Sequence, residues 1–233
     1  MKKVFLAVLL LMLSLLLLNT EVKSNDNKSA KPAETEQAGK INPKVIELPK
    51  PQTEGGKPLM QALKARQSSR QFSNKKIPLD VLSNLLWAAV GINRPDGRRT
   101  APTANNRQEI SIYAAMSDGF YLYDAKANTL NQVLTEDIRA ATGTQPFVAG
   151  APLNLIYVAD FSKMATTSEL DRTLYSAADT GFISQNVYLF CASEGMATVV
   201  RGLVDRARLS KIMNLKENQR IILAQTVGYP PNQ

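Results

Sequence analysis

The sequence predicts an α+β fold in which a central, mostly antiparallel sheet is flanked by helices around one long buried helix. Residues 166–195 form a proline-free stretch that could make about 42 Å of helix, at about 1.5 Å of rise per residue. Short segments of alternating or continuous apolar residues on both sides of this stretch indicate strands. Asp118-Gly119, between two of these segments, is typical of a hairpin turn and favours antiparallel pairing.

The long helix is predicted from its two ends and from its apolar second half. Thr166 and Glu169 form a Thr-x-x-Glu capping box, and Gly195 suits the left-handed residue that follows a helix end. The second half is apolar on nearly every side, which indicates a helix that is buried or lies in an interface. A plain core helix is one interpretation. The other is close approach of a second backbone or a flat ligand along a stripe of small residues, namely Ala177, Gly181, Ser184, Cys191 and Gly195.

Two shorter helices are predicted before the sheet. Pro58 and Pro78 each occupy a favoured first-turn position, and the helices end near Gln67 and at Gly91. Their apolar residues repeat at helical spacing, as Leu59, Ala62 and Leu63 in the first helix and Leu82, Leu85, Leu86 and Ala89 in the second.

The remaining elements follow from apolar periodicity and from β-branched residues. The predicted strands are residues 110–116, 120–123, 129–134, 153–158, 198–202 and 221–227, and two further helices are predicted at 136–142 and 205–213.

The first 24 residues have the composition of a secretory signal peptide. Lys2 and Lys3 precede an apolar run at 4–18, and small residues that suit cleavage follow. The run is shorter than the roughly 20 residues of a membrane span, and an uncleaved membrane anchor is the alternative. Residues 25–44 are polar and predict a disordered linker, which leaves 45–233 as one folded domain. We therefore expect an exported protein, periplasmic or extracellular.

Composition limits the classes of chemistry. The net charge is +8, but the basic residues are scattered, which argues against nucleic acid and suits a phosphate or another anionic ligand. The single cysteine excludes an internal disulfide framework. The sequence contains no histidine, so a Ser-His-Asp triad and a histidine metal site are both excluded. If the chain is an enzyme, we expect a cofactor to carry the chemistry.

A polar segment at the end of the first helix is the first candidate site. Arg66, Gln67, Ser68 and Arg70 offer guanidinium, amide and hydroxyl donors that could bind a phosphate through charge-assisted hydrogen bonds. Arginines are also common near helix C-termini because they complement the helix dipole, which is the alternative interpretation.

Two further segments are weaker candidates. The loop at 100–108, with Pro102, Thr103 and Asn105, suits a sugar or a polar ring edge, although a plain surface loop would have the same composition. Backbone amides of Val200, Arg201 and Gly202 (residues 200–202) could reach a ligand ring, because glycine permits close approach.

Taken in order, these motifs resemble the nitroreductase family of FMN-dependent oxidoreductases, and most closely its SagB-type, thiazoline-oxidase-like branch. The resemblance covers about residues 45–230 and is carried by Arg-Gln-Ser-Ser-Arg-Gln-Phe at 66–72, Arg-Thr-Ala-Pro-Thr-Ala-Asn-Asn at 99–106 and Asp-Thr-Gly-Phe-Ile-Ser-Gln-Asn at 179–186. It implies a nitroreductase-like sandwich, usually a homodimer with FMN at the subunit interface. The long helix would then form much of that interface.

The resemblance also implies roles for the candidate residues. Arg66 and Ser68 would hold the FMN phosphate and ribityl chain, and Arg70 would lie near the ribityl chain or the ring. The loop at 102–105 would come from the partner subunit, and the backbone at 200–202 would face flavin N5. Relatives place a basic pair near the C-terminus, whereas no basic residue follows Arg220 here.

The leading hypothesis is an exported FMN-dependent oxidoreductase. It would pass hydride or electrons from a reduced donor through flavin N5 to a small-molecule acceptor such as a nitroaromatic, a quinone or a peptide-derived ring. The alternative is a non-catalytic flavin- or ligand-binding protein on the same scaffold. A more distant alternative is a basic envelope-associated module that binds no cofactor.

Overall fold

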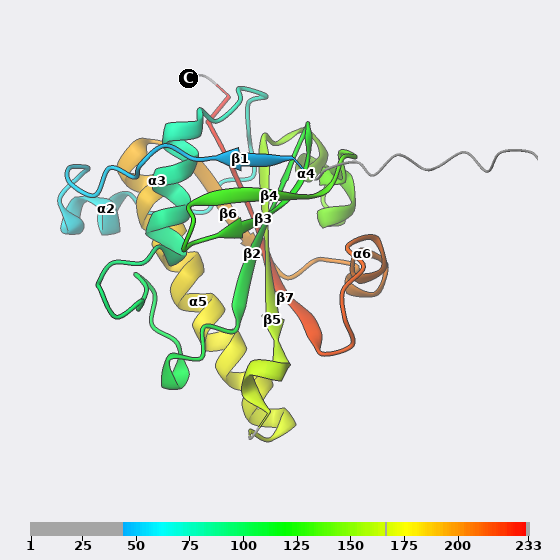
Figure 1. Ribbon diagram of the computed structural model, residues 1–233. Coiled ribbons are helices and arrows are strands. Elements are labelled where there is room, and N and C mark those ends of the chain that lie inside the picture. Colours follow the sequence, from blue (N-terminus) through cyan, green and yellow to red (C-terminus); the bar gives the residue numbers. More distant parts are fainter. Residues whose placement is uncertain (1–43, 166, 232–233) are drawn as a thin grey trace, which may run out of the picture. The chain divides into compact units, whose positions relative to one another are not determined.

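A computed structural model describes residues 44–165 and 167–231 (Figure 1). The predicted signal peptide at 1–24 and nearly all of the predicted linker at 25–44 lie outside these ranges. No helix in the described ranges is long and apolar enough to cross a membrane. The helices are α2 (Leu59–Ala65), α3 (Leu79–Val90), α4 (Phe147–Gly150), α5 (Glu169–Glu194) and α6 (Arg206–Ile212), with 3₁₀ helices η1 (Ala104–Asn106), η2 (Arg139–Thr142) and η3 (Phe161–Met164).

Within the described residues, seven strands form one sheet in the order β1-β4-β3-β2-β5-β7-β6, and every neighbouring pair is antiparallel. The strands are β1 (Val45–Glu47), β2 (Ile110–Met116), β3 (Gly119–Asp124), β4 (Thr129–Leu134), β5 (Leu153–Asp160), β6 (Ala197–Arg201) and β7 (Gln219–Gly228). The predicted strands and the α+β fold class are confirmed. The hairpin predicted at Asp118-Gly119 joins β2 to β3.

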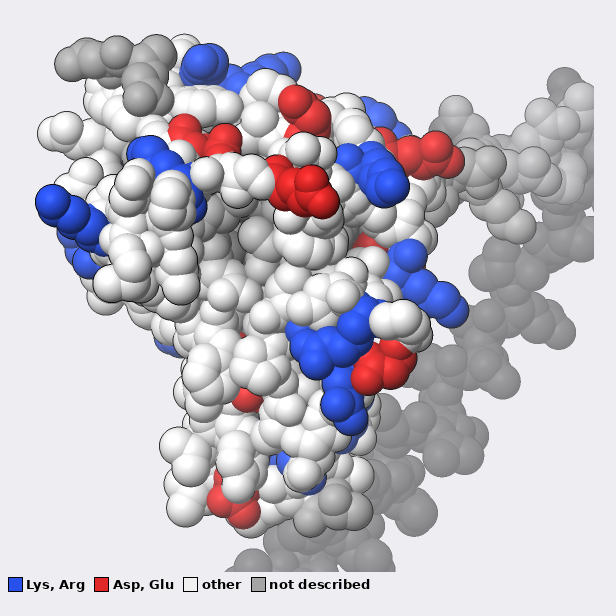
Figure 2. Space-filling view, turned by 90° about the vertical axis from the view of Figure 1, so that its left-hand side faces the viewer, with Lys and Arg blue, Asp and Glu red and all other residues white. Residues whose placement is uncertain are grey.

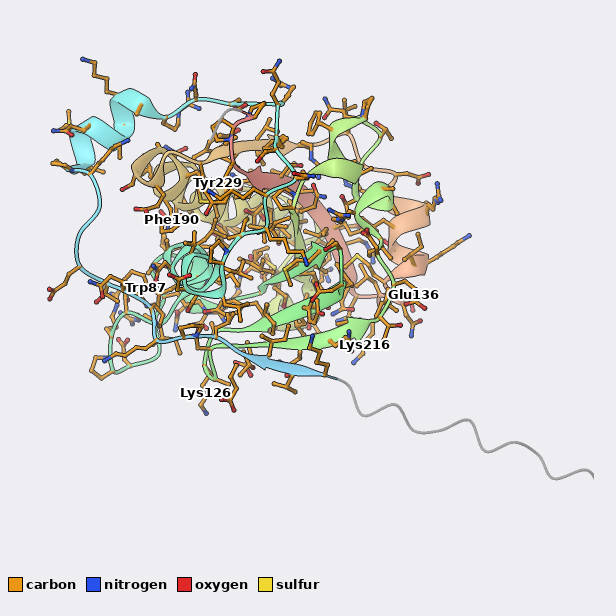
Figure 3. The ribbon with its side chains drawn as sticks, turned by 90° about the horizontal axis from the view of Figure 1, so that it is seen from above. Trp87, Lys126, Glu136, Phe190, Lys216 and Tyr229 are labelled. Atoms are coloured by element: carbon orange, nitrogen blue, oxygen red, sulfur yellow. The ribbon has the colours of Figure 1, made fainter. Side chains whose placement is uncertain are left out.

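Both faces of the sheet are covered, because side chains on successive strand residues point to opposite sides. On β2, Ile110 and Ile112 pack in the cluster that includes α3 and α5, whereas Tyr113 packs in the cluster that includes α6. Figure 3 shows Trp87 of α3 and Phe190 of α5 on the same side of the sheet. The layers are therefore α3 and α5, then the sheet, then α6 with η2.

The long helix α5 begins later than predicted. Thr166 lies outside the described residues, and the helix starts at Glu169 with Ser168 as its N-cap, whose hydroxyl accepts the Asp171 N–H at 3.1 Å. The prediction that Thr166 caps the helix is therefore wrong, because Ser168 supplies the same chemistry one half-turn later. The predicted end is confirmed, since Gly195 follows the helix with φ 69°.

Helix α5 is buried along one stripe only. The buried positions, which include Ser184 and Cys191, repeat at helical spacing against the sheet. The opposite side is exposed, with Phe182 at 48% and Leu170 at 77% of their accessible areas. The predicted stripe of small residues is therefore divided, because Ser184 and Cys191 face the core while Gly181 faces solvent.

The helix predicted at 136–142 is only the 3₁₀ helix η2, so this prediction is wrong in type and length. The Asp137 carboxylate accepts hydrogen bonds from the Arg139 backbone and side chain, which satisfies this segment locally and competes with an α-helical turn. Helix α2 also differs from expectation. Only Ala62 of its apolar face is buried, while Leu59, Met60 and Leu63 are exposed.

Gly195→Ala should destabilise the protein, because an alanine in the left-handed conformation costs about 1 kcal/mol. Chemical denaturation should show this loss. The matched control is Gly150→Ala in α4, where φ is not left-handed and nothing lies within 4 Å of the added methyl group. A change of less than about 0.5 kcal/mol is expected for the control. Equal stability of Gly195→Ala and the native protein would contradict the assigned helix end.

Candidate functional site

Tyr188 of α5 joins three of the predicted segments. Its hydroxyl lies 2.8 Å from the Ser68 hydroxyl and accepts the Val200 backbone N–H at 2.9 Å. The Arg66 guanidinium lies over the same ring, 5.4 Å from its centroid. The end of α2, the C-terminal part of α5 and strand β6 therefore meet at one side chain. Tyr188 was not predicted from the sequence, where it stands between apolar neighbours of a core helix.

The donors predicted around Arg66 stay available at the surface. Arg66 is half-buried, and Gln67, Ser68 and Arg70 are exposed. The segment is fixed on β6 because Ser69 N–H donates to Thr198 O at 2.9 Å. A cavity of about 290 Å³ lies beside it, lined in part by Gln67, Ser69, Tyr188 and Thr198. Two guanidinium groups and a hydroxyl at the end of a fixed segment fit an anionic ligand tail such as a phosphate.

Arg201 is directed into the protein rather than toward this cavity. Its side chain is 3% exposed and donates to the Thr226 hydroxyl at 2.9 Å, the Thr142 carbonyl at 2.9 Å and the Asn154 amide oxygen at 3.1 Å. Burial lowers the pKa of Arg201 to about 10. The Arg201 side chain therefore ties β6 to β5 and β7, and only its backbone can take part in a surface site. Gly202, one residue on, is exposed.

The loop predicted at 102–105 is held by α5. The carboxylate of Asp179, which is buried, accepts the Ala104 N–H at 3.1 Å. Pro102 and Asn105 are exposed, and Asn105 has φ 53°. This loop lines a cavity of about 490 Å³ together with Thr103 and three arginines, namely Arg94, Arg98 and Arg99. The loop is thus a fixed, polar and positively charged surface.

A single chain does not bring the two groups of predicted residues together. Tyr188, beside Arg66 and Ser68, and Asp179, beside the loop, lie about 14 Å apart along α5 at about 1.5 Å of rise per residue. The cavity beside Gln67 and the cavity beside Pro102 have no lining residue in common. These two groups are two candidate half-sites on one helix.

Known proteins with the same architecture are oxidoreductases. The family model described as "Nitroreductase family" matches residues 63–229. A crystal structure of a Ralstonia eutropha JMP134 protein described as a nitroreductase is 42% identical, with a TM-score of 0.78, over 81% of this chain and 90% of that chain. A Methanocaldococcus jannaschii protein named as a nitroreductase is 28% identical over 168 residues, which are 68% of this chain and 85% of its own length.

These similarities define an α+β oxidoreductase. The chain belongs to the nitroreductase family. The fold is also that of the NADPH:FMN oxidoreductase from Vibrio harveyi, with a TM-score of 0.57 at 21% identity over 75% of this chain and 69% of that chain. The assignment to a SagB-type branch within the family stays a prediction.

Arg201→Lys should destabilise the protein by about 3 kcal/mol, because a lysine ammonium cannot reach all three acceptors and leaves buried groups unpaired. Urea denaturation measures this loss. The matched control is Arg208→Lys in α6, where the side chain is exposed. A loss of equal size in both variants would contradict the structural role of Arg201.

Proposed function

We propose that the protein binds FMN between two copies of the chain and passes electrons from a reduced donor to a small-molecule acceptor. The observation that carries this proposal is the group of donors around Tyr188. Arg66 and Ser68 at the end of α2 and the Val200 backbone of β6 are held in contact with one aromatic side chain of α5. Family membership supports an oxidoreductase.

The chain's own residues would act by binding and orientation. Arg66 and Arg70 supply planar cationic donors for a phosphate, and Gln67 and Ser68 supply neutral donors beside them. The backbone at 200–202 is positioned by β6 and by the buried Arg201 side chain. A bound flavin would supply the two-electron chemistry that protein side chains do not perform.

A homodimer would complete the site. If two α5 helices cross in antiparallel directions near residues 181–185, then Asp179 of one copy lies near Tyr188 of the other. The loop at 102–105 of one copy then approaches Arg66 and Ser68 of the second. This arrangement is supported by exposed apolar residues on α5 and on the neighbouring helix α2, which are Leu170, Leu174, Tyr175 and Phe182 on α5 and Leu59, Met60 and Leu63 on α2.

The molecular surface agrees with such an interface. Helix α2 and the loop between α3 and β2 lie on the face that Figure 2 turns to the viewer, where charged side chains are scattered over a mainly uncharged surface. Gly181 is exposed on α5, and nothing lies within 4 Å of the position that an added methyl group would take, which leaves room for a second helix.

Two parts of the proposal rest on other observations. Export rests on the composition of residues 1–24. The acceptor class, whether nitroaromatic, quinone or peptide-derived ring, rests on the chemistry that flavins perform. A flavin-binding protein without turnover remains the second candidate, because the same donors would bind FMN in both cases.

Purified protein incubated with FMN and then desalted should keep the visible absorption of the flavin. A reduced donor should bleach this band without air, and an acceptor should restore it. Arg66→Ala should weaken FMN affinity by about tenfold or more, through loss of a charge-assisted hydrogen bond. Fluorescence titration measures the affinity.

The control for this variant is Lys64→Ala, an exposed substitution in the same helix, which should leave FMN affinity unchanged. Protein that stays colourless after incubation with FMN contradicts the proposed function. Bound flavin that no reduced donor bleaches supports the binding protein instead.

Phe182→Glu should dissociate the dimer, because it places a charge in the centre of the proposed apolar interface. Light scattering after size exclusion should show the mass of one chain, and FMN retention should fall with it. The control is Val133→Glu on β4, an equally apolar exposed position outside α5. A dimeric Phe182→Glu variant would show that α5 does not form the interface.

A further inference from the structure

Glu109 is a fully buried acid whose carboxyl group makes no hydrogen bond within the described part of the chain. Its exposed fraction is 0%, and neither carboxyl oxygen has a hydrogen-bond partner. It lies where the loop at 102–106 enters β2. An ionised carboxylate in this position would be costly, since a buried charge is stable only when donors or an opposite charge satisfy it.

The groups around Glu109 come from three directions. Asp179 of α5 lies beside the Glu109 carboxyl group and also holds the loop through Ala104 N–H. Lys163 of η3 is close enough to act on Glu109 but donates its hydrogen bond to Gln108 O at 2.8 Å. Arg99, in the preceding segment, is also close enough to act on Glu109, and its Nε atom has no partner among the described residues.

We propose that Glu109 carries a proton in the folded protein and donates it to the Asp179 carboxylate, so that one shared proton positions the 102–106 loop on α5. Two carboxyl groups can lie together in a protein interior when one of them is neutral, because the protonated group becomes a donor. Asp179 then accepts two hydrogen bonds, one from Glu109 and one from the Ala104 backbone.

The proposal makes loop position depend on pH in a stated direction. Burial, with the Asp179 carboxyl group adding to it, raises the pKa of Glu109 to about 7. The unfolded chain loses this proton near the ordinary value of about 4.3. The stabilisation is therefore complete below that ordinary value and is lost as the pH rises through about 7. If Glu109 were instead an anion paired with Arg99 and Lys163, stability would change in the opposite direction.

A role for Glu109 and Asp179 in cofactor binding rests on the proposed function, because the loop is one half of the flavin site there. The shared proton itself does not, and it can be measured on protein without flavin. If the protein does not bind FMN, the proposal of a shared proton still stands. If Glu109 and Asp179 share no proton, the proposal that the protein binds FMN still stands.

The test is the melting temperature between about pH 5 and about pH 8 for the native protein and Glu109→Gln. A glutamine amide donates to Asp179 at every pH. The melting temperature of the variant, relative to that of the native protein, should therefore rise by about 5 °C over this pH range. The control is Glu136→Gln, an exposed residue labelled in Figure 3, whose difference from the native protein should not vary with pH. If the melting temperature of Glu109→Gln minus that of the native protein stays constant or falls as the pH rises, the proposal is overturned.

A second measurement reports on the loop itself. Hydrogen exchange of the peptide that contains Ala104 is compared between the native protein and Glu109→Gln at each pH, which cancels the intrinsic pH dependence. The native peptide should exchange severalfold faster than the variant near pH 8 and equally near pH 5. If Glu109→Gln does not fold, Asp179→Asn serves instead and should show a weaker loss of stability with rising pH than the native protein. A steeper loss in that variant would overturn the shared proton.

Discussion

Helix α5 carries apolar residues on two opposite sides, of which only one is buried in the described chain, and the rest of the structure depends on this constraint. One stripe of this helix packs on the sheet with Ile183, Val187 and Cys191, while the opposite side exposes Leu174 and Phe182. A helix with apolar residues on both sides needs two partners. The sheet is one partner in the described chain. Both half-sites are attached to this helix, so whatever covers its free side also decides whether the half-sites meet.

Two buried ionisable side chains, Arg201 and Glu109, lie in or next to two of the surface segments that were predicted as candidate sites. Arg201 keeps its charge and donates to three uncharged acceptors, which locks β6 beside β7 and β5. The carboxyl oxygens of Glu109 have no hydrogen-bond partner among the described residues, and in our proposal Glu109 is neutral and becomes a donor itself. Each arrangement satisfies a buried polar group, and each fixes one half-site: Arg201 the backbone at 200–202, and Glu109 the loop at 102–106.

The sequence predicted what periodicity and local turn chemistry determine. The strands, the hairpin at Asp118-Gly119 and the helix end at Gly195 all depend on near neighbours in the chain. The contacts through which Tyr188 joins three segments and the inward direction of the Arg201 side chain could not be predicted, because both depend on residues distant in sequence. The predicted helix boundaries were wrong where a short side chain makes a competing hydrogen bond to the backbone, as Ser168 and Asp137 do.

The separation of the half-sites also explains why the loop must be held firmly. A loop that binds a ligand within its own chain could close on that ligand and be ordered by it. In the proposed dimer the loop contacts a ligand that is held by the other copy of the chain. A flexible loop would therefore weaken both dimer formation and ligand binding. Attachment of Ala104 to α5 through Asp179 places the loop on the helix that would form the interface of the proposed dimer. One helix then sets the distance between the two halves, and the ordering cost is met during folding rather than during binding.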